Sequence, residues 1–357
     1  MARYRRRRTK TLRQVLEGLG LDQETIDEAE RAGTAELLAI DRLVLPEKGR
    51  YTLTELAEKV EADPEVVRVF WRSLGFVEPV EDERIFTKTD VKTLSSLGSL
   101  VQSGAVDPAV TLQMARVLGQ SMAQLAAAVI DSAEIQAARS DDTDGGGGIA
   151  VRSGELLPFL SSAVDYSFRR HLRAAARRRV DLALDDEGRQ VVGFADLVRF
   201  TELSLRMDDD SLATMLERFD EIVHAVVVER RGRIVKMIGD AAMFTASNAD
   251  DAALIALDLM DAVAASPALE GVRVGMATGP VISRDGDLYG PTVNLASRLV
   301  GIGRGGAINV NEELRDALRG DRRFSVRTLG ERSLRHIGDV PVYRLRPGTL
   351  PRDGAPA

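Results

Sequence analysis

The sequence contains no cysteine. Disulfides, thiolate metal sites and cysteine nucleophiles are therefore excluded, and the composition fits a reducing compartment. Aromatic residues are also scarce, at 4% of the chain. No apolar run reaches the roughly 18 residues that a membrane helix requires, and the basic stretch Arg3–Lys10 is not followed by the apolar region of a signal peptide. These absences predict a cytoplasmic protein with no transmembrane segment.

The chain does contain enough apolar sequence for two ordinary domains. Of its 357 residues, 44% are hydrophobic and 29% are charged, and the net charge is −7. The acidic balance argues against a general nucleic-acid-binding function. The arginines of residues 1–10 predict only a short, solvated basic tail.

The first half is patterned as helices, and we expect a helical domain over residues 11–138. Its helices are predicted at Leu12–Glu17, Asp22–Ala32, Leu53–Val60, Pro64–Leu74 and Ala109–Ala133. An acidic run that ends in Gly145–Gly148 predicts a break. An arginine-rich helix follows over roughly Glu155–Val180, broken or kinked at Pro158. Residues 139–185 are therefore predicted to be a linker.

From Gln190 onward, short apolar strands alternate with helices. Strands are predicted at Val191–Asp196, Arg233–Ile238, Ala241–Ala246, Val272–Thr278, Ala307–Val310 and Val340–Leu345, and helices at Ser211–Arg230, Asp250–Ala265 and Pro291–Val300. This β-α-β-β-α-β order with additions predicts an α+β, ferredoxin-like fold, with helices packed on one face of a sheet that contains antiparallel pairs.

Two aspartates stand at the ends of predicted strands. Asp196 closes an apolar strand, and Asp240 follows Gly239 in the turn between two others. Carboxylates placed in this way hold hard cations, and two that converge clamp a pair of Mg²⁺ ions on a phosphate. Taken singly, an aspartate in a Gly-Asp turn is just as typical of turn chemistry.

A third segment adds an amide and a guanidinium. Asn294 and Arg298 are four residues apart, on one face of a helix that begins at Gly290-Pro291. Such a pair near a helix amino terminus suits an anionic ligand that carries hydroxyls. An asparagine near a helix start and a solvated arginine are each ordinary on their own.

Together these segments resemble the class III adenylate and guanylate cyclases. The matching pieces are Phe194-Ala195-Asp196-Leu197 with Phe200-Thr201, Lys236-Met237-Ile238-Gly239-Asp240, and Asp287-Leu288-Tyr289-Gly290 with Val293-Asn294-Leu295-Ala296-Ser297-Arg298. They occur in the family's order over roughly Gln190–Leu345, so a cyclase domain is expected at 186–347 and a disordered tail at 348–357. The whole layout is similar to the mycobacterial-type pH-sensing adenylate cyclases, in which a helical amino-terminal domain inhibits the catalytic one.

The resemblance implies a metal site and a base-reading pair. Asp196, with adjoining Leu197, and Asp240 match the residues that hold two Mg²⁺ or Mn²⁺ ions. Lys236 and Asp287 match the pair that reads the purine. Lysine donates to N1 of adenine and aspartate accepts from its amino group, whereas guanine presents the reverse polarity, so ATP is favoured over GTP.

The resemblance also implies a reaction without a protein nucleophile. The ribose 3′-hydroxyl of ATP, activated by metal, attacks the α-phosphorus and expels pyrophosphate. Asn294 matches the residue that orients the ribose, Arg298 the one that stabilises the transition state, and Phe200 and Thr201 match substrate-binding positions. In the family, metal residues of one subunit face base-reading and arginine residues of the other, so a homodimer with two equivalent sites is expected.

Two positions depart from the family's pattern. Many members have glycine where Arg199 stands, and a cation there either helps to hold phosphates or points to solvent. Arg335 and His336 stand where members often have a Lys-Gly pair whose lysine grips the polyphosphate. Arg335 is the candidate for that role.

The segment Tyr51–Phe76 supports an alternative, because it resembles a helix-turn-helix with Thr54 and Asp63 as helix caps. The alternative is a DNA-binding regulator with a nucleotide-binding partner domain. Residues 11–138 carry 12 Lys and Arg against 22 Asp and Glu, a balance of 12 − 22 = −10, which disfavours specific DNA binding. A third possibility is a cyclase-like protein that only binds nucleotide, although all six motif positions are present.

The linker helix contains one of the three histidines of the chain, His171, beside Arg170 and Arg173. A histidine changes charge near pH ~6.5, so acidification would add positive charge between two acidic domains and relieve inhibition. A surface histidine on a solvated helix is an equally ordinary interpretation. His224, whose apolar neighbours suggest partial burial, is the rival sensor.

Overall fold

The computed structural model describes residues 11–139, 149–183, 189–303 and 305–352. The predicted basic tail, the four glycines of the break and residues 353–357 of the predicted carboxyl-terminal tail lie outside these ranges. The chain divides into two compact units, Met1–Arg173 and Ala174–Ala357, here called the first and the second unit. No helix in the described ranges is long and apolar enough to cross a membrane.

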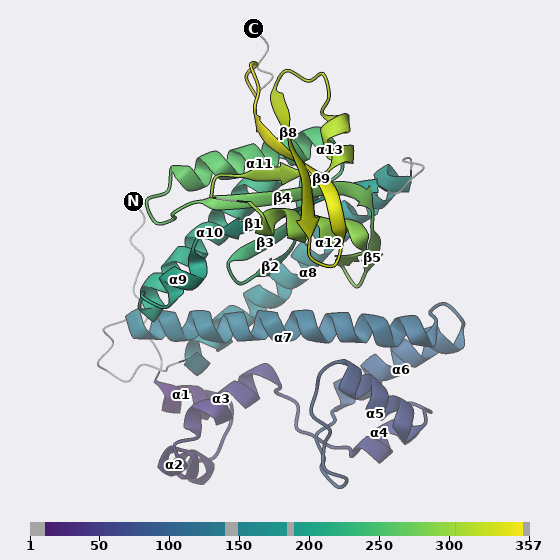
Figure 1. Cartoon of the computed structure of the whole chain (residues 1–357). Coiled ribbons are helices and arrows are strands. Elements are labelled where there is room, and N and C mark those ends of the chain that lie inside the picture. Colours follow the sequence, from purple (N-terminus) through teal and green to yellow (C-terminus); the bar gives the residue numbers. More distant parts are fainter. Residues whose placement is uncertain (1–10, 140–148, 184–188, 304, 353–357) are drawn as a thin grey trace, which may run out of the picture. The chain divides into compact units, whose positions relative to one another are not determined.

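The first unit is helical, as the sequence predicts (Figure 1). Its helices are α1 (Leu12–Gly18), α2 (Gln23–Ala32), α3 (Ala35–Val44), α4 (Leu53–Lys59), α5 (Pro64–Ser73), α6 (Lys88–Gln102) and α7 (Pro108–Arg139), followed by α8 (Ile149–Ala183), which crosses the division between the units. Of the break or kink predicted at Pro158, the break is wrong, because helix α8 is continuous through that residue.

Side-chain caps explain where α4 and α5 begin. Thr52, and not the predicted Thr54, caps α4, because its hydroxyl accepts the Glu55 N–H while the Glu55 carboxylate accepts the Thr52 N–H. Asp63 caps α5 as predicted, since its carboxylate accepts the Glu65 N–H at 2.7 Å.

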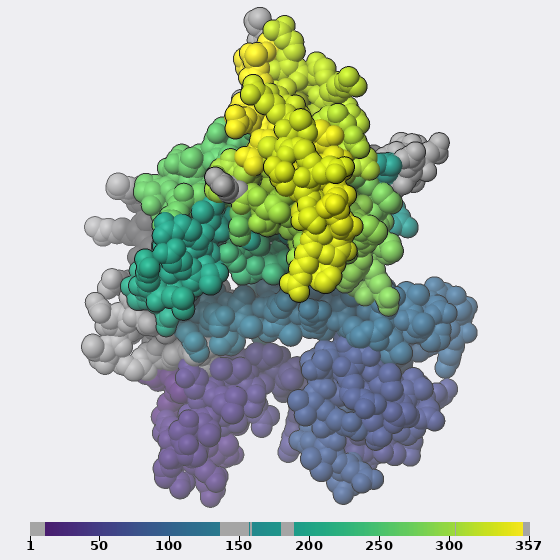
Figure 2. All heavy atoms as spheres, in the orientation of Figure 1, coloured from purple at the N-terminus to yellow at the C-terminus, as the bar shows by residue number. Residues whose placement is uncertain are grey.

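The second unit is built on one mixed sheet with the strand order β2-β3-β1-β4-β7-β9-β8 and a separate β5–β6 hairpin. Its strands are β1 (Arg189–Leu197), β2 (Arg233–Ile238), β3 (Ala241–Ala246), β4 (Val272–Pro280), β5 (Ile282–Arg284), β6 (Asp287–Tyr289), β7 (Ile308–Val310), β8 (Phe324–Leu334) and β9 (Gly338–Pro347). Its further helices are α9 (Phe200–Ser204), α10 (Asp209–Glu229), α11 (Ala249–Ala264), α12 (Pro291–Gly301) and α13 (Glu312–Ala317). The α+β prediction is confirmed. In Figure 2 the long β8–β9 pair, yellow-green and yellow, lies on the surface.

Alternation along β1 builds a core on each face of the sheet. Val191, Ala195 and Leu197 pack with buried residues of α10 and α11, whereas Val192 and Phe194 pack with α12. The prediction that helices cover one face is therefore incomplete, because α12 covers part of the other. Asp196 has the parity of Val192 and Phe194, so it belongs to the face on which α12 packs.

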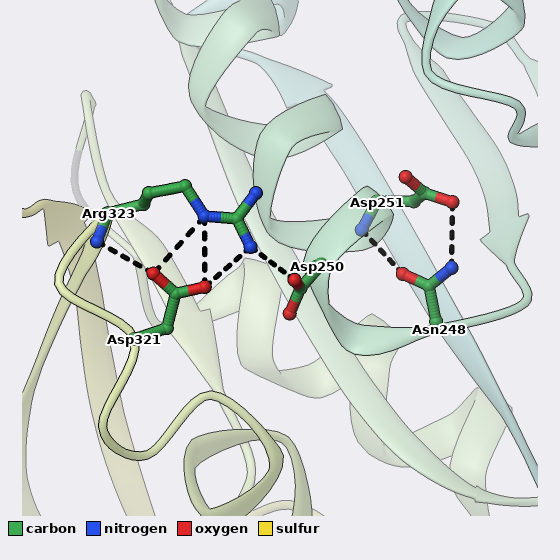
Figure 3. Close-up of polar contacts among 5 residues, drawn as sticks. All are labelled: Asn248, Asp250, Asp251, Asp321 and Arg323. Carbon is green, nitrogen blue, oxygen red and sulfur yellow. Dashed lines mark hydrogen bonds and ion pairs between the residues drawn. The ribbon is translucent and has the colours of Figure 1, made fainter. Parts of the chain in front are cut away.

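A cluster of ion pairs at the edge of the sheet joins the start of β8 to the start of α11 (Figure 3). The Arg323 guanidinium donates to Asp321 at 2.9 Å from Nε and also pairs with Asp250 in the first turn of α11. Asn248 caps that helix by accepting the Asp251 N–H at 2.7 Å. Just beyond β9, the Gly348 N–H donates to the Arg323 carbonyl at 2.7 Å, so residues 348–352 are attached to this edge and differ from the disordered tail predicted there.

Candidate active site

Asp196 and Asp240 are brought together by the main chain. The register of β1 and β3 sets Asp196 opposite Ala241, next to Asp240 in the turn after β2. The Leu197 N–H donates to the Asp240 carbonyl at 3.0 Å, which joins the two carboxylate-bearing segments directly. Gly239 enables the turn, because its φ of 60° lies in the left-handed region that glycine adopts without strain.

The positive charge near Asp196 and Asp240 does not fully compensate their two negative charges. Burial raises the pKa of Asp240, the negative charge of Asp196 raises it further, and Arg273 opposes both effects only in part. A pair of half-buried, mutually repelling carboxylates is a donor set that suits a hard divalent cation. Within the described ranges no three His, Cys, Asp or Glu side chains form a metal-binding group, so a cation here needs further oxygen ligands from a bound molecule.

Arg273 is a site residue that the sequence analysis missed. It stands opposite Asp196 in the β1–β4 register, and its Nε and Nη2 lie 2.9 and 2.8 Å from Oδ1 of Asp196. It is the one charged residue of β4, and an arginine in an otherwise uncharged strand was the available signal. A guanidinium that faces two carboxylates beside a turn is able to meet phosphate oxygens once cations take over the carboxylates.

Lys236 and Asp287 form a second pair, from β2 and β6. Lys236 Nζ lies 2.5 Å from Oδ2 of Asp287. Burial on its own raises the pKa of Asp287, but hydrogen bonds from Lys236 and from the Leu288 N–H outweigh burial, so the pKa lies below its ordinary value. The pair therefore offers one cationic donor and one anionic acceptor side by side, as the sequence predicts for a reader of a base edge.

Helix α12 presents Asn294 and Arg298 on its exposed face. The Thr292 hydroxyl donates to the Pro280 carbonyl at 2.7 Å and holds the start of the helix on β4. Near its end, a side chain at Gly275 would meet the Val300 nitrogen at 2.2 Å, so only glycine permits this approach. The buried Asn309 amide donates to the Leu299 carbonyl at 2.8 Å, next to Arg298.

The turn that follows β1 keeps a glycine-like conformation without glycine. Arg199 has a φ of 62°, and its exposed guanidinium forms ion pairs with Glu202 at 2.9 Å and with Glu270 at 3.2 Å. Phe200 and Thr201 begin α9 directly after it.

The second departure from the family's pattern shows the same backbone conformation. His336, next to the exposed Arg335 in the β8–β9 turn, has a φ of 65°. Both departures thus retain the backbone conformation that glycine takes easily.

Some of the predicted site residues contact one another in the structure, and others do not. Asp196 and Asp240 form one group, and Lys236 and Asp287 form another. Among the described residues, neither Asn294 nor Arg298 makes a hydrogen bond or ion pair to these groups.

Neither histidine suggested by the sequence occupies the site. His171 is exposed on α8 within the first unit. His224 is exposed on α10, so its predicted partial burial is wrong.

Comparisons with known proteins show which proteins this chain is similar to. Residues 186–347 match the sequence profile described as adenylate and guanylate cyclase catalytic domain. The chain is similar to an adenylate cyclase of Streptomyces coelicolor, with 36% identity over 79% of this chain and 75% of that protein. It is also similar to a pH-sensitive adenylate cyclase of Mycobacterium tuberculosis, with 27% identity over 92% of this chain and 86% of that protein. Among solved structures, a guanylate cyclase domain from Catenaria anguillulae in complex with GTP is 22% identical and covers 45% of this chain and 97% of that one, with a TM-score of 0.41.

Proposed function

This chain is an enzyme of the class III adenylate and guanylate cyclase family, and on that premise we propose that its second unit converts ATP to 3′,5′-cyclic AMP and pyrophosphate. The observation that carries the proposal is the Asp196–Asp240 carboxylate pair, joined through the main chain and faced by Arg273. Two Mg²⁺ or Mn²⁺ ions fit this donor set. When bound, they would make the ribose 3′-hydroxyl more acidic and neutralise phosphate charge.

The side chains then bind and orient ATP for an in-line displacement. Lys236 donates to adenine N1 and Asp287 accepts from the amino group, which requires their mutual ion pair to open towards the base. Asn294 orients the ribose so that O3′ faces the α-phosphorus. The new bond between O3′ and the α-phosphorus forms as the bond between the α-phosphorus and the oxygen that bridges to the β-phosphate breaks. The hydroxyl proton goes to solvent, and pyrophosphate leaves.

Cationic side chains meet the charge that builds up on the phosphates. Arg298 is proposed to stabilise the charge at the α-phosphorus, while Arg273 and Arg335 hold the polyphosphate. Phe200 and Thr201, at the amino terminus of α9, would contact the phosphates from the other side, beside the backbone of Leu197.

We further propose that the active site is shared between two copies of the chain. Support comes from α12, whose Asn294 and Arg298 do not reach the carboxylates of their own chain within the described ranges. Ile238, Ile282 and Tyr289, close in sequence to the base-reading pair, expose 46%, 64% and 49% of their surface and suit an apolar interface.

Mixing two inactive variants tests the shared site. Asp240→Ala spoils one half of each site and Arg298→Ala the other, so a random mixture should regain about a quarter of the activity, because half of the dimers are mixed and each has one intact site. A mixture that stays inactive while both variants form dimers would place the whole site within one chain.

Activity itself separates the candidate functions. Purified protein with Mn²⁺-ATP should form cyclic AMP and pyrophosphate in equal amounts. ATP binding without turnover would indicate a nucleotide-binding protein, and retention of a specific DNA sequence would indicate a DNA-binding regulator. The structure does not favour the DNA-binding alternative, because the arginines of α5 are already paired: Arg68 with Glu65 at 3.0 Å and Glu78 at 2.7 Å, and Arg72 with Glu65 at 3.1 Å.

Regulation by the first unit is part of the proposal, with His171 as its pH-sensitive residue. Its charged neighbours on α8 are Arg170 and Arg173, while Arg169 is paired with Asp165 at 2.8 Å. Removing residues before 186 should raise basal activity if the first unit inhibits. The pH–activity profile of full-length His171→Ala should be flatter between mildly acidic and neutral pH than that of the wild type. Superimposable profiles would remove His171 from the mechanism and leave the cyclase activity unaffected.

A further inference from the structure

One hollow of the second unit has no part in the reaction described above. Its volume is about 560 Å³, and it lies between the last turns of α8, the start of β1, the end of β3 and the β5–β6 hairpin. All of its lining residues fall within Ala174–Ala357, so the hollow belongs to one compact unit. This volume is in the range of small-molecule sites, roughly 300–1,000 Å³.

Four arginines line this hollow: Arg178 and Arg179 of α8, Arg231 between α10 and β2, and Arg233 at the start of β2. None of its described lining residues is acidic, and within the described chain none of the four arginines forms an ion pair. In contrast, Arg230, which directly precedes Arg231 in the sequence, pairs with Asp258 at 2.7 Å.

Arg233 is anchored to the hairpin by its guanidinium. It is half-buried, and its Nη1 donates to the Gly286 carbonyl at 3.1 Å, which leaves its charge without a carboxylate. Burial lowers the pKa of Arg233, the charge of Arg178 lowers it further, and Asp287 opposes both effects. Like charges held together around a hollow favour an anion that touches several of them at once.

The remaining wall supplies donors suited to phosphate. Ser247 and Ser283 bring hydroxyls, and bidentate guanidinium groups match phosphate geometry. The hollow is separate from the metal carboxylates, because Gln190 in its wall and Asp196 are six residues apart on β1, roughly 20 Å. It adjoins the base-reading pair, since Gly286 and Leu288, the neighbours of Asp287, also line it.

We propose that this arginine pocket is a second binding site, for a phosphate-bearing small molecule of nucleotide size. The ligand bridges α8 and β2 through Arg178, Arg179, Arg231 and Arg233. Because α8 continues into the first unit, an occupied pocket fixes the last turns of that helix against the sheet beside Asp287. The site goes beyond the proposed reaction and requires neither metal nor turnover.

Calorimetric titration of full-length protein with inorganic tripolyphosphate in the presence of EDTA tests the site. EDTA removes divalent cations, so the negative charges of Asp196 and Asp240 then repel tripolyphosphate from the proposed active site. Wild-type protein should bind tripolyphosphate. Arg178→Gln/Arg233→Gln should bind at least tenfold more weakly. The matched control, Arg298→Gln/Arg335→Gln, removes the same charge from the proposed active site and should change the affinity less than twofold.

Three results would overturn the proposal: absence of binding by the wild type, unchanged binding by Arg178→Gln/Arg233→Gln, or an equal loss in the control pair. If Arg178→Gln/Arg233→Gln has an altered thermal unfolding transition, the same titration is repeated with Arg178→Gln/Arg179→Gln. Both of these changes lie on one helix and leave the sheet intact, so weaker binding by this variant is not due to a disturbed sheet. Cyclic AMP formation by the same preparations tests the reaction independently of this binding.

Discussion

The two units of this protein are stabilised to very different extents by their cores. The second unit has one cluster of 30 buried apolar residues and another of 10. The described residues of the first unit form two clusters of five buried residues each. Apolar burial is the main favourable term in folding, so a unit with two small cores has a small margin of stability.

The first unit adds polar contacts at its surface instead. Arg13 of α1 donates to Asp27 at 2.5 Å and to Glu30 at 2.6 Å, and Arg84 donates to both oxygens of Glu55 at 2.6 and 2.7 Å. Exposed ion pairs of this kind contribute little each. From this comparison we expect local opening to cost less free energy in the first unit than in the second, which is compatible with the regulatory role proposed for the first unit.

The largest effect is expected for Asp240→Ala, which should lower turnover without lowering the stability of either unit. Asp240→Ala removes a carboxylate whose raised pKa reflects burial and repulsion by Asp196, while the main-chain bond from Leu197 remains. Turnover with Mn²⁺-ATP should fall by on the order of 10³-fold or more, the scale of one lost transition-state contact of about 4 kcal/mol. The melting temperature should stay within a degree or two. Near-normal turnover would show that the carboxylate pair is not the metal site.

The contrast between the cores is tested by one pair of matched substitutions. Leu56 in the first unit and Leu257 in the second are 0% and 2% exposed. Truncation to alanine costs about 2–5 kcal/mol at either position. In calorimetry, Leu56→Ala should abolish a low-temperature transition and leave cyclic AMP formation in place, whereas Leu257→Ala should lower a separate, higher transition. A single transition lowered equally by both would mean that the units unfold together.

A smaller effect is expected on the choice of base. Replacing Lys236 with Glu and Asp287 with Cys removes both adenine contacts. Since each lost hydrogen bond costs about 1–3 kcal/mol and two are lost, kcat/KM for ATP should fall by roughly 30-fold or more. Activity with GTP should fall far less. If the ratio of ATP to GTP use is unchanged, specificity resides elsewhere in the site.

The smallest effect concerns acid stability of the first unit. A hydrogen bond from Arg84 holds the pKa of Glu55 below its ordinary value. A carboxylate with a depressed pKa stabilises the fold above its unfolded pKa, about 4.3 for glutamate, and this contribution is lost as pH falls through the lower folded pKa. Glu55→Gln should therefore flatten the pH dependence of the low-temperature transition below about pH 4.3. Glu58→Gln, an exposed change on the same helix, should leave it as in the wild type.

The sequence predicted the parts of the site that are local along the chain. The Gly239-Asp240 turn and the i, i+4 pair Asn294 and Arg298 follow from short-range rules, and the structure has that turn and that helix face. Arg273 escaped prediction because its meaning depends on the β1–β4 register, which pairs residues 77 positions apart. The long strand β8 was missed because it is an edge strand with mostly exposed side chains and lacks an apolar pattern.

The hydrogen bond from the Leu197 N–H to the Asp240 carbonyl links the position of one aspartate to that of the other through the main chain. The spacing of the two aspartates is set by strand register, so it persists when a neighbouring side chain is replaced by another that fits the core. A deletion of one residue in β1 or β3 would instead turn a carboxylate to the opposite face of the sheet. Conservative substitutions in β1 and β3 are therefore expected to be tolerated better than insertions or deletions within these two strands.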